Sequence, residues 1–149
     1  MTIELPNRVG EAPHVVGPAP HGQRSQVAPV MLQEELWSRM RALPYVFMAP
    51  TLVSVPHSRA LHLPEGIGSR DPAAFQGGRE FAHVHPHSDS SLHLMVEQEL
   101  MDVVERSGWG VRHPAQPPVL VYGPRDRQEL EVVWWLVQQS WQYAMTLGS

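Results

Sequence analysis

The sequence predicts a single α+β domain in which an antiparallel sheet carries helices on one face. Its 149 residues have the length of one ordinary domain, and 42% of them are hydrophobic, which suffices for a buried core. Short β-compatible segments bounded by turn residues occupy the middle of the chain, and three stretches show helical spacing. No apolar run approaches the ~18 residues of a membrane span, so we expect a soluble domain that does not enter a membrane.

Residues 1–30 show neither helical nor strand periodicity. They are interrupted by prolines and glycines at Pro6, Gly10, Pro13, Gly17, Pro18, Pro20, Gly22 and Pro29. We therefore expect a disordered, Pro-rich N-terminal arm over 1–30 and a folded domain over 31–149. The first residues contain no basic start followed by an apolar run, which predicts no secretory signal and a cytoplasmic location.

Helical spacing first appears over 31–43. The apolar residues there recur every three or four positions and Pro44 closes the pattern, which predicts a short amphipathic helix. Two β-compatible segments follow over 51–55 and 59–63, separated by Pro-His-Ser. We expect these segments to form a meander, followed by a loop over 64–78.

Residues 79–96 have the pattern of a β-hairpin. Two segments with alternating apolar residues, 80–85 and 92–96, flank a polar turn. An amphipathic helix is predicted over 98–106, and the apolar run 119–122 is typical of a buried central strand.

A long C-terminal helix is predicted over 127–145. Asp126 and Glu129 have the spacing of a capping box at its start. Apolar residues, Trp135 among them, occupy two sides of this helix. That pattern indicates either burial between other elements or a homodimer contact through the helix.

The composition excludes several classes of function. The chain contains no cysteine, which excludes disulfides, thiolate metal ligands and cysteine nucleophiles. The net charge is −4, and only 11 residues are Lys or Arg, so the chain offers no basic surface for a phosphate backbone and we expect no nucleic-acid partner. Nine residues are histidine, the side chain whose ordinary pKa lies nearest to neutral pH.

Three of these histidines are predicted to share one face of the hairpin. Residues two apart in a strand project from the same side, so His83 and His85 point together, and pairing of the strands adds His93. Asp89 in the turn is placed to fix an imidazole tautomer or to add a carboxylate ligand. His113 is a candidate fourth member.

The hairpin spacing leaves three interpretations of this histidine face open. Taken alone, it favours histidines on the solvent-facing side of an antiparallel sheet that are either solvated or hydrogen-bonded to Ser90, Ser91 and Asp89. His83, His85 and His93 could instead bind Zn²⁺ or non-haem iron, or could act without a metal as acids and bases. The remaining histidines are interpreted as arm, loop or surface residues: His14, His21, His57, His62 and His87.

Two other residues are candidates for binding. Trp109 lies between two glycines, where an indole can wall a pocket. Arg125 has the planar guanidinium that suits a bound anion.

Three blocks of sequence resemble the luciferase domain of bioluminescent fungi and its bacterial relatives. The first, 79–94, contains Arg-Glu-Phe-Ala-His-Val-His, a later Asp and Leu-His-Leu. The second, 108–114, reads Gly-Trp-Gly-Val-Arg-His-Pro, and the third, 122–143, begins Tyr-Gly-Pro-Arg. The resemblance extends over about residues 55–144. The chain departs from the fungal pattern at His87, where the fungal stretch has an aromatic residue, and in its arm, where the fungal proteins have a hydrophobic segment.

The resemblance implies an oxygenase that adds O₂ to an aromatic enol or hydroxypyrone, a small-molecule substrate, without a reductant or an organic cofactor; a divalent metal is not favoured. The implied catalytic residues are His83, His85, His93 and His113. The implied substrate-binding residues are Asp89, Trp109, Arg112, Tyr122 and Arg125.

The chemistry of these side chains fits that reaction. A histidine suits removal of the enol proton, and His113, Arg112 and Arg125 suit stabilisation of the resulting oxyanions. Trp109 and Tyr122 would exclude water. The alternatives are a non-catalytic domain that binds a small molecule or a metal through the same histidines, and an interaction protein that uses its C-terminal helix.

Overall fold

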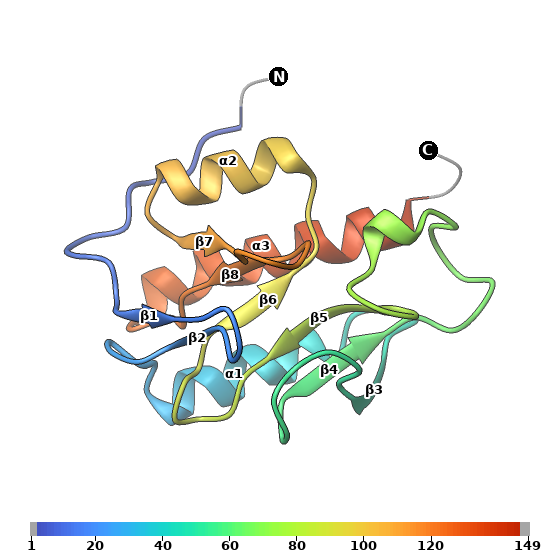
Figure 1. The fold of residues 1–149 in the computed structure, drawn as a ribbon, viewed down its shortest axis with the longest axis horizontal. Helices are drawn as coiled ribbons and strands as arrows, with labels where there is room; N and C mark the ends of the chain where they lie inside the picture. Colours follow the sequence, from blue (N-terminus) through green and yellow to red (C-terminus); the bar gives the residue numbers. More distant parts are fainter. Residues whose placement is uncertain (1–2, 147–149) are drawn as a thin grey trace.

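The computed structural model describes residues 3–146, and within them it shows the predicted single α+β domain (Figure 1). A six-stranded antiparallel sheet forms the centre, and a separate two-stranded sheet lies near the N-terminus. The strands of the large sheet are, in spatial order, β3 (Phe47–Pro50), β4 (Arg59–His62), β5 (Glu80–Val84), β6 (Leu92–Leu94), β8 (Val119–Val121) and β7 (Gly110–Arg112).

Three α-helices within residues 3–146 match the predicted ones closely: α1 (Val30–Met40), α2 (Gln98–Arg106) and α3 (Arg127–Met145). The α3 start is capped as expected, because the Asp126 carboxylate accepts a hydrogen bond from the Glu129 N–H at 2.8 Å. A single 3₁₀ turn, η1 (Pro72–Ala74), lies in the predicted loop. No helix in the described part of the chain is long and apolar enough to cross a membrane.

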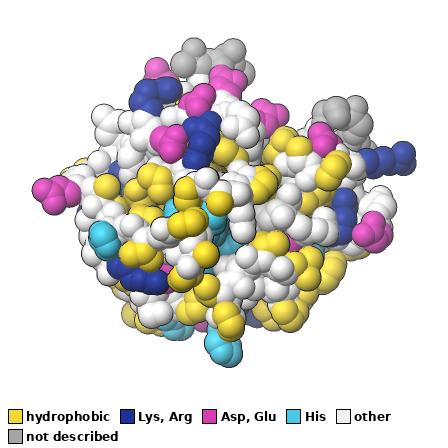
Figure 2. All heavy atoms as spheres, in the orientation of Figure 1, with side chains coloured by type: hydrophobic (Ala, Val, Ile, Leu, Met, Phe, Trp, Pro, Cys, Tyr) yellow, Lys and Arg dark blue, Asp and Glu magenta, His cyan; other side chains and the backbone are white. Residues whose placement is uncertain are grey.

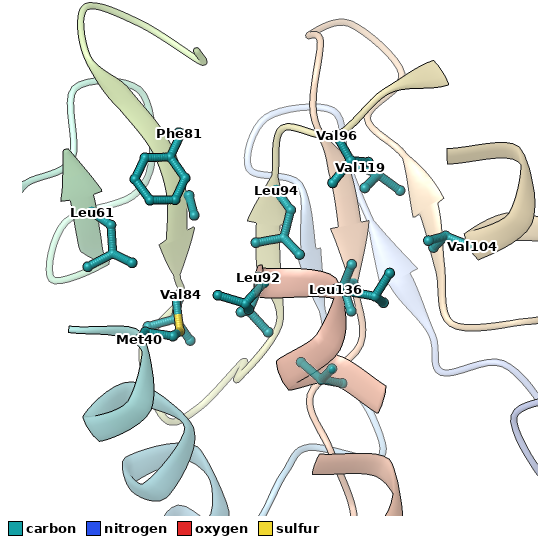
Figure 3. Close-up of a cluster of buried hydrophobic side chains, with 14 of the residues drawn as sticks. Met40, Leu61, Phe81, Val84, Leu92, Leu94, Val96, Val104, Val119 and Leu136 are labelled. Carbon is teal, nitrogen blue, oxygen red and sulfur yellow. The ribbon is translucent and has the colours of Figure 1, made fainter. Parts of the chain in front are cut away.

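The hairpin register separates an apolar face from a histidine face. In the pairing of β5 with β6, His83 lies opposite His93, whereas Val84 lies opposite Leu92. The apolar face packs against α1 and α3, and Met40 and Leu136 of these helices belong to the same buried cluster as Val84 and Leu92 (Figure 3). The Ser140 hydroxyl of α3 also donates to the Met95 carbonyl at 2.7 Å. The helices therefore cover the side of the sheet that faces away from the histidines.

The predicted strand over 51–55 is wrong. The strand that pairs with β4 is instead β3, which ends at Pro50, and the following residues turn across the sheet. There the Thr51 hydroxyl and the Leu52 N–H donate to the buried Glu80 carboxylate, at 3.0 and 2.7 Å. Satisfying a buried charge outweighs strand propensity in this segment. The short strand β7 was not predicted.

The N-terminal segment contains little regular structure, as its prolines and glycines predict, but it is packed onto the domain. Its strands β1 (Val15–Val16) and β2 (Gly22–Gln23) form a small antiparallel sheet. Gln23 is fully buried and joins three segments. Its backbone N–H donates to Asp89 at 3.1 Å, and its side-chain oxygen accepts from the Gly123 N–H at 3.0 Å. These long-range hydrogen bonds fix a segment whose local sequence favours no structure.

The two apolar sides of α3 are covered by the sheet and by α1. Trp135 is half-buried against the core, as are Trp134 and Trp141. Burial between elements thus accounts for much of the pattern. A homodimer contact through this helix stays a prediction.

Gly110 allows β7 to approach β8 closely. A Cβ at this position would lie 1.9 Å from the Leu120 carbonyl oxygen. We expect Gly110→Ala to lower the free energy of unfolding by about 3 kcal/mol, because backbone must move to accept the methyl group. Gly66 is the control: its φ is +82° and nothing lies within 4 Å of a Cβ there. Gly66→Ala should cost only about 1 kcal/mol of backbone strain. Equal losses in urea denaturation would contradict this account of β7.

Candidate functional site

Five histidines gather on the sheet face opposite the helices. His83, His85 and His93 are 2, 2 and 5% exposed. His21 from the N-terminal segment is also buried, and the half-buried His113 follows β7. The structure therefore brings together the four predicted catalytic residues and adds His21, which sequence reasoning had assigned to the arm. His83, His85 and His93 are therefore not solvated, because loops and the β1–β2 sheet cover them. The expected hydrogen bonds to Ser91 and Asp89 are present at His85.

The five histidines form a cluster, and a series of hydrogen-bonded side chains runs through it, starting at Glu80. The Glu80 carboxylate lies 2.8 Å from the Nδ1 of His83, whose Nε2 lies 3.1 Å from the Nδ1 of His93. The Nε2 of His93 in turn lies 2.9 Å from the Nδ1 of His21. Each His–His contact holds one proton between two nitrogens, so the cluster can move a proton by exchanging tautomers.

A β-bulge brings Glu80 onto the histidine face. Leu61 pairs with Ala82, but the next residue, His62, pairs with Glu80, so Phe81 is the extra residue. Strict alternation would have placed Glu80 on the same face as Ala82, in the core. Burial alone would raise the pKa of Glu80, but hydrogen bonds from His83, Leu52 and Thr51 outweigh it and hold the pKa below its ordinary value. Glu80 is therefore a buried carboxylate.

A second carboxylate orients His85. The Nδ1 of His85 lies 3.2 Å from Asp89 Oδ1 and 2.9 Å from the Ser91 hydroxyl. Burial would raise the pKa of Asp89, yet its hydrogen bonds with His85 and Ser91 lower it overall. On the other side, the buried Gln33 of α1 donates to the His85 carbonyl at 2.7 Å. Asp89 thus lies where the sequence predicted, behind an imidazole.

Burial lowers the pKa of His21, His83, His93 and His113 because it disfavours their charged form. It lowers the pKa of His21 to about 4, and repulsion by His113 and His85 adds to the effect. Burial likewise lowers the pKa of His83, although the bond to Glu80 opposes it. For His93, burial and the four neighbouring histidines act in the same direction and hold its pKa far below the ordinary value.

A cavity of about 350 Å³ borders the cluster. His21, His83, His93 and His113 form one wall, and apolar residues from two loops, including Pro18 and Val55, form others. In Figure 2 histidine side chains are visible near the centre of one face, with hydrophobic side chains around them. A cavity of this size and lining suits a small, partly apolar ligand.

The structure separates the other predicted substrate-binding residues from the histidines. Arg112 forms ion pairs with Asp102 and Glu105 of α2, at 2.7 and 2.6 Å. The ring of Tyr122 is buried under the Arg8 guanidinium, 5.1 Å from the ring centroid. Neither residue lines the histidine cavity.

Trp109 and Arg125 lie beside a different, larger cavity of about 620 Å³. The Trp109 indole N–H donates to the Pro6 carbonyl at 2.7 Å. The Arg125 guanidinium donates to Glu129 and to the Val9 carbonyl, at 2.5 and 2.6 Å. Both side chains thus hold the N-terminal segment in place, and the larger cavity contains no histidine.

Residues 78–140 match the luciferase domain family. The resemblance expected from the sequence is confirmed. A luciferase of Neonothopanus nambi is 31% identical over 100 residues, covering 56% of this chain and 38% of that protein. Luciferases of Armillaria gallica and Armillaria mellea are each 34% identical over 87 residues, covering 52% of this chain and 32% of each relative. The chain thus spans about a third of the length of these luciferases. No solved structure matches it.

The matched luciferase segment contains four of the clustered histidines but not the fifth. His83, His85, His93 and His113 lie within 78–140, whereas His21 lies far outside it. No local pattern marked His21, because its position follows from long-range hydrogen bonds made by its neighbours. The N-terminal segment is therefore the part of the site that the family match does not describe.

Gln23 provides a test of how that segment is held. Gln23→Ala removes the acceptor of the buried Gly123 N–H, and we expect it to lower the free energy of unfolding by about 2 kcal/mol. Hydrogen exchange should also become faster over residues 14–24. Gln142→Ala, at an exposed position of α3, is the matched control and should change neither quantity. Unchanged exchange in the Gln23 variant would mean that other contacts fasten the segment.

Proposed function

We propose that this chain is an oxygenase-like enzyme that adds O₂ to an aromatic enol or hydroxypyrone bound beside the histidine cluster. The observation that carries the proposal is the cavity of about 350 Å³ walled by four histidines, three of which lie in the luciferase-matched segment. The names of the fungal relatives support the same class of chemistry. The size of the cavity and its apolar loops fit a single aromatic ring system.

The reaction needs no external reductant. Loss of the enol hydroxyl proton makes the substrate an electron-rich enolate, and its carbon forms a bond to O₂. The electron pair of the enolate reduces O₂ to the level of a peroxide, and the proton removed at the start returns to the outer oxygen. The protein then has two tasks, which are to accept and return one proton and to keep water from the intermediate.

His21 and His113 are placed for the proton-transfer task. Both line the cavity, and their ring centroids lie 4.5 Å apart. The Nδ1 of His113 accepts hydrogen bonds from the Ala115 and Gln116 N–H groups at 3.0 and 3.1 Å. In the neutral ring the proton of His113 therefore lies on Nε2, where it can be donated to a developing oxyanion.

Oxygen uptake by the purified chain with a hydroxylated styryl-pyrone tests the proposal. We expect turnover in the wild type, and at least a ~10²-fold lower kcat/KM in His21→Gln and His113→Ala, the usual scale for an acid–base group. His87→Ala is the control, because His87 is exposed and pairs with Glu34 outside the cavity. Saturable pyrone binding without any oxygen uptake would favour the non-catalytic binding domain instead.

A further inference from the structure

The three most buried histidines share one arrangement: each has one ring nitrogen bound to an outer partner. His83 uses Nδ1 toward Glu80, and His85 uses Nδ1 toward Asp89 and Ser91. His93 uses Nε2 toward His21. The opposite nitrogens of His83 and His93 face each other inside the group at 3.1 Å and share a proton that a bound metal ion would displace. Histidines that bind metals have this arrangement, because the outer partner fixes the tautomer and the direction of the ring.

We propose that His83, His85 and His93 bind one divalent first-row transition-metal ion. One nitrogen from each ring lies within 4.8 Å of the others, and the ring centroids are 4.8 to 5.1 Å apart. With metal–nitrogen bonds of about 2.0–2.1 Å, two neighbouring ligand nitrogens lie roughly 3.0–3.4 Å apart. The Nε2 of His83 and the Nδ1 of His93 already have a separation of 3.1 Å. His85 offers the third nitrogen, within 4.8 Å of the other two.

The charges around the three histidines favour a cation. Glu80 and Asp89 bring two negative charges into a buried region. In residues 3–146 no Lys or Arg pairs with Glu80, and Asp89 has only the half-exposed Arg24 at 3.8 Å. Buried carboxylates without a full countercharge are costly. A divalent ion bound by the three imidazoles would balance both carboxylates.

The ligand set selects the class of metal. Three imidazoles, with no thiolate available in the chain, suit Zn²⁺, Fe²⁺ or Co²⁺ and not Mg²⁺ or Ca²⁺, which prefer oxygen ligands. Three protein ligands also leave one coordination position open, as in catalytic and not in structural zinc sites. His83 and His93 line the cavity, so the open position is accessible to a small ligand there.

A second group, His21, His93 and His113, also has nitrogens within 4.8 Å of one another. It is the weaker candidate because His113 is half-exposed and no carboxylate lies behind its ring. Its Nδ1 accepts from two backbone N–H groups instead. The two groups share His93. An ion bound by His83, His85 and His93, the inner group, would therefore fix which nitrogen holds the proton between His93 and His21.

Titration of the chelator-treated, untagged chain with Zn²⁺ and Co²⁺ tests the proposal. Calorimetry should show one ion per chain, and Co²⁺ should give the visible absorption of a nitrogen-ligated site. His83→Asn and His93→Ala should weaken binding by at least 10²-fold, and Glu80→Gln by 10- to 100-fold, the range for outer partners. His87→Ala and His113→Ala should bind like the wild type.

Folding of the variants is checked by circular dichroism. If the buried histidine variants do not fold, the wild-type stoichiometry and the Glu80→Gln variant still decide the question, together with the rise in the unfolding midpoint that Zn²⁺ should cause. Absence of saturable binding by the wild type would overturn the proposal. The proposal would also be overturned if His113→Ala lost binding while His83→Asn retained it, because the ion would then belong to the outer group, His21, His93 and His113.

The metal site does not depend on oxygenase activity. Oxygen uptake measured on the same samples separates the two. Saturable metal binding without oxygen uptake contradicts the oxygenase alone. Oxygen uptake by a chain that binds neither ion contradicts the metal site alone.

Discussion

The contact between the Glu80 carboxylate and His83 is the interaction on which the site depends. A carboxylate with no exposed surface needs donors on every side, and it obtains them from His83, Thr51 and Leu52. This requirement explains why the chain after β3 folds over the sheet and does not extend it. The same contact fixes the His83 ring, which in turn determines how His93 and His21 can be placed.

The architecture was predictable because it depends on short-range patterns. The period of two along 80–85 placed His83 and His85 on one face, and pairing with β6 added His93 as expected. The capping residues located the start of α3 to within one position. These features depend on residues only a few positions apart, so one sequence carries enough information to specify them.

The remaining parts of the site depend on contacts that no local pattern encodes. One extra residue, Phe81, moves Glu80 to the histidine face, and a bulge has no strong signature in a single sequence. His21 reaches His93 across 72 positions of sequence. Arg125 and Trp109 were expected at the histidines because of their chemistry, whereas the structure uses them to hold the N-terminal segment.

The N-terminal segment has a consequence for access to the histidines. It is held by hydrogen bonds at Gln23, Ala28 and Arg125, and its Ile3 and Leu5 pack against the core. A segment held in this way can detach at a lower free energy than global unfolding requires. The histidines can therefore become exposed to solvent while the sheet and helices beneath them stay folded.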